Sequence, residues 1–244
     1  MDIITYLNNN KVIIDENITR KSDKNSIDIS SQLDLIVMIQ SRLMNNKITI
    51  IPRINSTIGK DVENFRVQIK KVDKLLNTIN LKNNKNEFDF YLLEKGNIAL
   101  NRAKTSFDVM DNESYFDLIR RSMNNYEMCL GRVDEGNLKL AENEILKIRT
   151  TKYISYNLIE HDLFNYIKRI KRRNFNIQIE KVIDEFVYKS SLSEKSKNYL
   201  TALCNYPFET MKLIYKYRGY DDNDYDDWIK KINMAIEIDG DEII

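Results

Sequence analysis

Apolar residues recur at intervals of three and four positions along most of this chain, and this spacing predicts a mainly helical protein. In an α-helix such positions fall on one face, which can pack against the rest of the protein. The helix predicted after Asn112, for example, should turn Tyr115, Phe116, Ile119 and Met123 inward. The predicted helices contain the apolar sets at residues 29–44, 62–79, 88–110, 115–123, 163–170, 179–187, 200–203, 211–215 and 228–235.

The first 58 residues have a mixed pattern. Two runs rich in β-branched residues, 11–15 and 47–51, are typical of strands, and they lie on either side of the predicted helix at residues 29–44. No glycine occurs before Gly59. This part therefore contains no glycine-rich loop that could bring backbone amides close to the phosphates of a nucleotide.

The helical period stops after Tyr126, and a short hairpin is predicted further on. Residues 138–140 and 144–148 have the pattern of two strands, and residues 141–143 would form the turn between them. A helix, an irregular loop, a hairpin and another helix is also the order of elements around the catalytic loop of a kinase.

The loop before this hairpin has the spacing of a phosphotransferase catalytic loop but lacks its carboxylates. In kinases an aspartate accepts the proton of the substrate hydroxyl, an asparagine helps to hold a metal ion, and a second aspartate holds the metal that bridges the phosphates. Asn137 stands at the asparagine position. Arg132 and Arg149 stand at the positions of the two aspartates.

These residues resemble the CotS-type spore coat proteins, which belong to the aminoglycoside phosphotransferase and choline kinase-like superfamily. In that family the loop reads Cys-His-Gly-Asp, four further residues and Asn-Ile-Leu, and the later segment reads Ile-Asp-Phe-Asp. Leu130 replaces the histidine, in addition to the two arginines. The resemblance begins at about Asn86. Its matching segments are residues 129–132, 137–138, 148–151, 162–169 and 192–217.

The resemblance implies an α+β, mainly helical, protein-kinase-like fold of the aminoglycoside phosphotransferase type. Residues 1–58 would form a reduced N-terminal lobe, and residues 59–244 a helical C-terminal lobe that contains the short β-hairpin. The resemblance also implies a degenerate, pseudokinase-like member of the family. Such a protein would be synthesised in the cytoplasm, bind other spore coat proteins and assemble on the spore.

The two arginines should remove the phosphotransfer chemistry. A guanidinium stays protonated, so Arg132 cannot accept a proton and Arg149 cannot coordinate Mg²⁺. Asn137 alone offers too few oxygen ligands for a hard cation. We therefore expect no catalytic residue, no metal site and no ATP or magnesium cofactor, with Leu130, Arg132, Asn137 and Arg149 as degenerate positions.

Two guanidiniums in place of two carboxylates should make the cleft attractive to anions. One hypothesis is that Arg132 and Arg149 form a metal-free site for phosphate, nucleotide or an acidic peptide, because guanidiniums pair bidentately with such groups. The alternative is that both side chains point to solvent or form exposed ion pairs. Their partners would then be Asp134, Glu135 or Glu144.

Other candidate residues receive structural interpretations. Asp134 and Glu135 lack the register of displaced catalytic acids and are expected in a solvated loop. His161 has no triad partner at motif spacing and is expected to cap a helix or lie at the surface. The basic run at residues 168–173 is expected to be the solvated face of a helix. The acidic run at residues 221–227 lacks the mid-loop glycine and closing glutamate of an EF-hand.

Composition narrows the classes of partner. The 38 lysines and arginines against 37 aspartates and glutamates give a net charge of +1, so no global field favours nucleic acid or an anionic membrane. Cys129 and Cys204 lie far apart, which argues against a disulfide framework or a zinc site. No apolar run is long enough to span a bilayer, and the first residues lack the pattern of a signal peptide. We expect a reduced cytosolic chain with no nucleic acid or membrane partner, and the oligomeric state stays open.

Two other functions also stay open. The retained Asn137 and the loop spacing fit an active small-molecule phosphotransferase of the aminoglycoside or choline kinase type. An unrelated helical protein-binding module is the second alternative, and it would lack the hairpin at residues 138–148.

Overall fold

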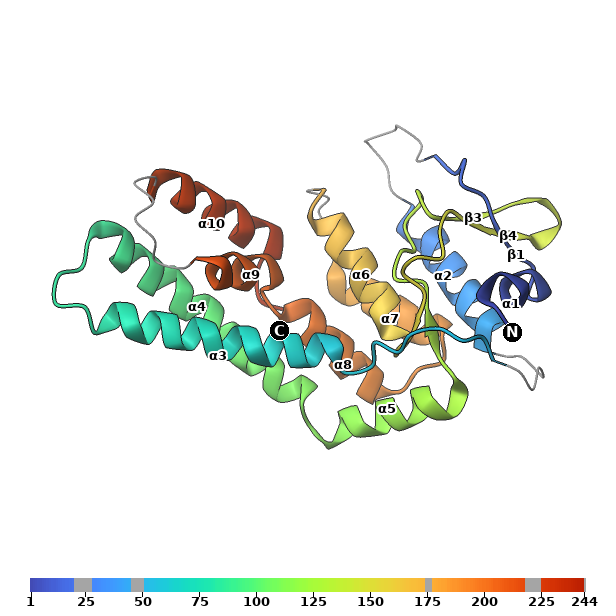
Figure 1. Ribbon diagram of the computed structural model, residues 1–244, viewed down its shortest axis with the longest axis horizontal. Coiled ribbons are helices and arrows are strands. Elements are labelled where there is room, and N and C mark those ends of the chain that lie inside the picture. The colour runs from blue at the N-terminus through green and yellow to red at the C-terminus, as the bar shows by residue number, and fades with distance from the viewer. Residues whose placement is uncertain (20–27, 45–50, 174–176, 218–224, 244) are drawn as a thin grey trace. The chain divides into compact units, whose positions relative to one another are not determined.

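The computed structural model is mainly helical with a few short strands, as the apolar spacing predicts (Figure 1). No helix in the described ranges has both the length and the hydropathy that crossing a membrane requires. Most of the predicted strand at residues 47–51 and of the acidic run at 221–227 lies outside the described residues. The structure describes residues 1–19, 28–44, 51–173, 177–217 and 225–243.

The chain divides into two compact units that alternate along the sequence. Unit 1 consists of Met1–Ile58 and Glu113–Leu200, and unit 2 consists of Gly59–Asn112 and Thr201–Ile244. The assignment of residues 1–58 and 59–244 to two kinase-type lobes stays a prediction.

A three-stranded sheet in unit 1 contains the predicted hairpin. Strand β3 (Leu138–Leu140) runs antiparallel to β4 (Leu146–Ile148), and Leu138 pairs with Ile148. Strand β1 (Val12–Ile14) lies parallel to β4 on its other side, which gives the order β1-β4-β3. The hairpin at residues 138–148 and the first N-terminal strand are therefore confirmed.

A second, two-stranded sheet fixes the start of the loop that carries Arg132. Strand β2 (Met128–Cys129) pairs antiparallel with β5 (Ser155–Tyr156), and Met128 lies opposite Tyr156. The loop thus leaves one small sheet at β2 and enters the three-stranded sheet at β3.

Helix α6 supplies much of the core of unit 1. Its side chains Leu163, Tyr166, Ile167 and Ile170 are all buried, at the three- and four-residue spacing of one helix face. Burial of each such side chain stabilises the fold by roughly 1.5–3 kcal/mol. The helices that contribute to unit 1 are α1 (Ile3–Asn9), α2 (Ile29–Met44), α5 (Glu113–Asn125), α6 (Glu160–Lys171), α7 (Ile179–Lys189) and the first part of α8 (Glu194–Asn205).

Helix α5 buries a different face from the predicted one. Tyr115 is buried as expected, but Phe116 is 60% exposed and Met123 is 61% exposed. Leu118 is buried instead, and Arg121 is drawn inward by two buried carboxylates. The predicted buried face of α5 was therefore wrong for Phe116 and Met123, because the ion pairs of Arg121 with Glu127 and Glu160 fix the rotation of this helix.

In unit 2, helices α3 (Lys60–Asn80) and α4 (Glu87–Met110) lie side by side (Figure 1). Helix α4 begins with a capping box at Asn86, which satisfies N–H groups of the first turn. A Cβ atom at Gly96 would lie only 2.7 Å from a methyl group of Leu76. The missing side chain therefore lets the two helices pack closely.

Helices α9 (Phe208–Lys216) and α10 (Tyr225–Asp239) complete unit 2 and contact each other. Asp239, at the end of α10, accepts hydrogen bonds from the backbone N–H groups of Glu209 at 3.0 Å and Thr210 at 2.8 Å. A buried carboxylate thus satisfies two donors at the start of α9, which would otherwise lack helical partners.

Candidate functional site

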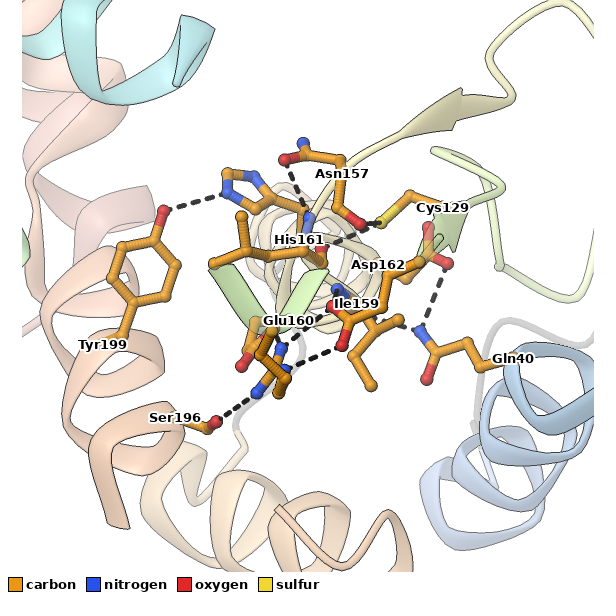
Figure 2. A network of polar contacts seen from close by, with 12 residues as sticks. Gln40, Cys129, Asn157, Ile159, Glu160, His161, Asp162, Ser196 and Tyr199 are labelled. Atoms are coloured by element: carbon orange, nitrogen blue, oxygen red, sulfur yellow. Dashed lines mark hydrogen bonds and ion pairs between the residues drawn. The ribbon is translucent and has the colours of Figure 1, made fainter. Parts of the chain in front are cut away.

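The start of the Arg132 loop is held by a buried carboxylate on α6. Asp162 accepts hydrogen bonds from the backbone N–H groups of Leu130 at 3.1 Å and Gly131 at 2.8 Å. The side-chain amide of Gln40 on α2 donates to Asp162 at 3.3 Å and to the carbonyl of Ile159 at 3.0 Å. Figure 2 shows Gln40 pointing toward Asp162. One carboxylate therefore joins the loop to α2 and α6.

The carboxylate of Asp162 is fully buried. Burial raises the pKa of Asp162 from 3.8 to about 6, although the three N–H donors act in the opposite direction. Cys129 is also buried, and its thiol donates to the carbonyl of Leu158 at 2.9 Å. Burial raises the pKa of the Cys129 thiol well above its usual range, so this cysteine is packed in the core and is not an activated nucleophile.

Gly131 allows the loop to turn next to another backbone segment. Its φ is +68°, in the left-handed region that glycine adopts without steric cost. A Cβ atom at this position would lie 2.8 Å from the carbonyl oxygen of Tyr153. Both the backbone conformation and the close approach therefore require glycine.

The backbone brings the three predicted site residues together. The side-chain amide of Asn137 donates to the carbonyl of Arg132 at 2.6 Å. The carbonyl of Asn137 accepts a hydrogen bond from the backbone N–H of Arg149 at 2.9 Å. Asn137 is fully buried, and its Oδ1 has no hydrogen-bond partner among the residues described. The loop therefore keeps the asparagine in one fixed orientation with a free acceptor oxygen.

The two arginine side chains have different surroundings. The Nε of Arg132 lies 3.9 Å from Oδ2 of Asp134, and its guanidinium carbon lies 5.9 Å from the centre of the Tyr153 ring. Arg149 is exposed, and within the described ranges its guanidinium makes no hydrogen bond or ion pair. The pairing of Arg132 and Arg149 in one anion site stays a prediction.

Asp134 is not a solvated loop residue, so that expectation was wrong. It is only 2% exposed, its Oδ1 accepts a hydrogen bond from the N–H of Gly136 at 3.0 Å, and its Oδ2 lies 2.9 Å from Arg169. Its neighbour Glu135 is partly exposed and accepts a hydrogen bond from Tyr166 at 3.2 Å. The sequence did not reveal these contacts because their partners lie on α6, more than 30 positions away.

The basic run at residues 168–173 is also more than a solvated helix face. Arg169 pairs with Asp134, and Arg173 donates to Glu135 at 3.2 Å. Arg169 lies in the last turn of α6, where positive charge also interacts favourably with the helix dipole, and Arg173 follows two positions after the helix ends. The expectation for this run was therefore wrong for these two residues, which help to hold the loop.

His161 is buried rather than at the surface, which corrects the prediction for this residue. It is 3% exposed, and its Nε2 lies 3.0 Å from the hydroxyl of Tyr199 (Figure 2). The ring also packs edge-on against Phe164. It belongs to the core between α6 and α8.

A buried ion-pair network lies beside Asp162 and has no signal in the sequence. Arg121 binds both oxygens of Glu127, at 2.7 and 3.0 Å, and one oxygen of Glu160 at 2.8 Å. It also donates to the hydroxyl of Ser196 at 2.8 Å. Ser196 and Glu160 are labelled in Figure 2. Burial acts to lower the pKa of Arg121, but Glu160 and Glu127 outweigh it and raise the pKa. The network ties α5, α6 and α8 together.

The carboxylates of this loop are poorly placed for proton transfer or metal binding. Asp134, three positions before Asn137, accepts a hydrogen bond from the N–H of Gly136 through its Oδ1, and its Oδ2 lies 2.9 Å from Nη1 of Arg169 without accepting a hydrogen bond. Arg169 therefore neutralises the charge of the buried Asp134 carboxylate. Among the residues that the structure describes, no three histidine, cysteine, aspartate or glutamate side chains are grouped so that they could hold a metal ion.

Comparison with known proteins identifies the fold. No family model matches the sequence, and no curated protein matches it. The structure is similar to that of an aminoglycoside phosphotransferase from Alicyclobacillus acidocaldarius, with a TM-score of 0.64 and 11% sequence identity, over 86% of this chain and 62% of that one. This chain therefore spans less than two thirds of the length of that enzyme. At this identity the similarity concerns the fold alone, and the chain has a mainly helical α+β fold of the aminoglycoside phosphotransferase type.

Proposed function

We propose that this chain is a non-catalytic, pseudokinase-like protein that acts by binding other proteins. The observation that carries the proposal is that Arg132 stands at the position of the catalytic-loop aspartate and Arg149 at that of the metal-binding aspartate after the hairpin, while Asn137 is retained. The resemblance to CotS-type proteins favours other spore coat proteins as its partners and the spore coat as its place of assembly.

The chemistry of the loop supports the lack of turnover. Loss of a general base typically costs about 10²- to 10⁴-fold in rate. Of the three positions that would handle proton and metal, only Asn137 offers a side-chain oxygen, its buried Oδ1, and the other two carry the guanidiniums of Arg132 and Arg149. Hard cations need several oxygen ligands, so the loop disfavours both the proton transfer and the metal-bound phosphates.

An active small-molecule phosphotransferase is the second candidate, and one observation favours it. Asp162 still holds the loop through Leu130 and Gly131, and Asn137 still presents an acceptor oxygen without a partner among the described residues. The unrelated helical module is disfavoured, since it required the absence of the hairpin at residues 138–148.

Turnover of ATP is the measurement that separates these functions. Purified protein is incubated with Mg²⁺ and ATP, with and without aminoglycoside or choline acceptors, and release or transfer of the γ-phosphate is followed. The variant Asn137→Ala serves as the matched control. We expect equal background rates for both proteins. Turnover at an enzymatic rate that falls in Asn137→Ala would refute the proposal.

The proposed place of assembly has its own test. Tagged protein is produced in a sporulating bacterium, and the insoluble spore layer is separated from the soluble cytosol. We expect the chain in the insoluble layer, together with cross-linked coat proteins. Complete recovery in the soluble fraction would refute the coat assignment without affecting the result on catalysis.

A further inference from the structure

Three arginines of unit 1 converge on two adjacent carboxylates of the loop. Nη1 of Arg169 lies 2.9 Å from Oδ2 of Asp134, and Nε of Arg132 lies 3.9 Å from the same oxygen. Nη1 of Arg173 lies 3.2 Å from Oε2 of Glu135. We call Arg132, Arg169 and Arg173 the arginine cluster.

This region carries more positive than negative charge. Burial lowers the pKa of Arg169, Asp134 acts against this, and Arg132, Arg173 and Arg172 lower it further. The three guanidiniums of the cluster and the two carboxylates leave a surplus of one positive charge, three minus two. Guanidiniums held close together repel one another, and an anion that joined them would relieve this repulsion.

Many donors of the cluster have no acceptor among the described residues. A guanidinium has five N–H groups. Arg173 uses one of them in its hydrogen bond to Glu135, and Nε of Arg132 is buried without any hydrogen bond. A buried donor without an acceptor is costly, so this geometry favours an additional ligand oxygen.

The cluster is open to solvent while the carboxylate between its members is not. The side chains of Arg132, Arg169 and Arg173 are 28%, 35% and 17% exposed, whereas that of Asp134 is 2% exposed. A ligand from solution can therefore reach the guanidiniums without displacing Asp134.

We propose that Arg132, Arg169 and Arg173 bind the phosphate group of a phosphate-bearing ligand without a divalent metal ion. A phosphate offers several acceptor oxygens that match the planar fork of a guanidinium, and the charge of a phosphate monoester is about −1.5 to −2 at neutral pH. The positive surplus of the cluster attracts such an anion. The proposal rests on the proposed function in one respect, namely that the loop does not use magnesium.

The proposal changes the composition of the anion site that the sequence suggests. Arg132 remains a member, but its partners are Arg169 of α6 and Arg173 just after that helix, rather than Arg149. Arg149 is exposed, and its guanidinium makes no hydrogen bond or ion pair with the described part of the chain, whereas Asp134 pairs with Arg169 in the cluster.

Calorimetry with inorganic phosphate tests the site directly. The protein is titrated in EDTA at constant ionic strength, with inorganic phosphate, ADP and O-phosphoserine as probes of a free, a nucleotide and a side-chain phosphate. We expect saturable binding of at least one probe, with one ligand per chain. Addition of excess Mg²⁺ should not strengthen the binding of inorganic phosphate.

The variant Arg132→Gln removes one guanidinium that makes no hydrogen bond to the loop, so the fold should persist, which the thermal unfolding midpoint verifies. We expect binding to weaken about tenfold or more, the effect of one charged hydrogen bond. Arg120→Gln is the matched control, because Arg120 is 72% exposed on α5 and pairs with Asp117. It should bind like the wild type.

Three results would overturn this proposal: no saturable binding of any probe, an equal loss in Arg120→Gln and Arg132→Gln, or an absolute requirement for magnesium. These results are independent of the turnover assay. Enzymatic turnover of ATP would refute the non-catalytic function, whereas absence of phosphate binding in EDTA would refute only the arginine cluster as a ligand site.

Discussion

Replacement of Asp162 by alanine should loosen the loop in a manner that depends on pH. The substitution removes the acceptor of the N–H groups of Leu130 and Gly131, and Gln40 keeps its second acceptor at Ile159. A buried donor without an acceptor costs about 1–3 kcal/mol, so two cost about 2–6 kcal/mol.

The charge of Asp162 offsets part of this loss at neutral pH. The rise of its pKa from 3.8 to about 6 means that burial of the ionised carboxylate costs about 3 kcal/mol. The alanine variant no longer bears this cost. Its free energy of unfolding at pH 7 should therefore fall by up to about 3 kcal/mol.

The loss should grow on acidification. A carboxyl group with a raised folded-state pKa binds its proton more tightly in the folded state, so its contribution to stability rises as the pH falls through about 6. Between pH 7 and pH 4 this contribution of Asp162 should increase by about 2 kcal/mol in the wild type and not at all in Asp162→Ala.

Urea unfolding of both proteins at pH 7 and pH 4 measures this difference, and amide hydrogen exchange at Leu130 and Gly131 locates it. The matched control is Asp239→Ala, which removes a buried carboxylate from two backbone donors in unit 2. It should leave exchange at Leu130 and Gly131 unchanged. A stability difference between wild type and Asp162→Ala that stays constant or shrinks on acidification would refute the reasoning.

Two further substitutions test the surroundings of the loop. Arg121→Met should lower the free energy of unfolding in urea by about 3–5 kcal/mol, because it leaves the buried carboxylates of Glu127 and Glu160 without their cation. An unchanged free energy of unfolding would contradict a stabilising role of this ion-pair network. Gly131→Ala and Gly240→Ala both place alanine at a positive φ, which costs roughly 1–2 kcal/mol. Only Gly131 also faces a backbone carbonyl, so its alanine variant should show the larger drop in unfolding midpoint, and equal drops would contradict the close approach.

Local signals in the sequence predicted most of the helices and the hairpin, but not helix α1, strands β2 and β5, or the contacts between elements. The helices follow from apolar spacing, and the hairpin follows from the end of the helical period after Tyr126 and the strand-like runs further on. The burial of Asp134 depends on Arg169, 35 positions away, and no local pattern encodes such a pair. Helix α5 shows the same limit, since Arg121 sets its rotation against the apolar stripe that includes Phe116.

The sequence likewise predicted part of the candidate site and missed the rest. The spacing of the motif predicted that Arg132, Asn137 and Arg149 lie in one region. The hydrogen bonds of Asn137 to the backbone of Arg132 and Arg149 agree with this prediction. Spacing could not reveal that Asp162 holds the loop, because its partners Leu130 and Gly131 belong to a different segment of the chain. Side-chain direction also depends on packing, which is why Arg132 faces Asp134 while Arg149 faces solvent.

The parallel pairing of β1 with β4 has a consequence for synthesis on the ribosome. Val12 pairs with Leu146, so the first strand emerges long before its neighbour is translated. Until then its backbone donors and acceptors are open to other chains, and pairings between distant segments form slowly. We expect nascent chains that stop before β4 to need a chaperone and to aggregate without one, whereas the α3 and α4 pair can form early from neighbouring sequence.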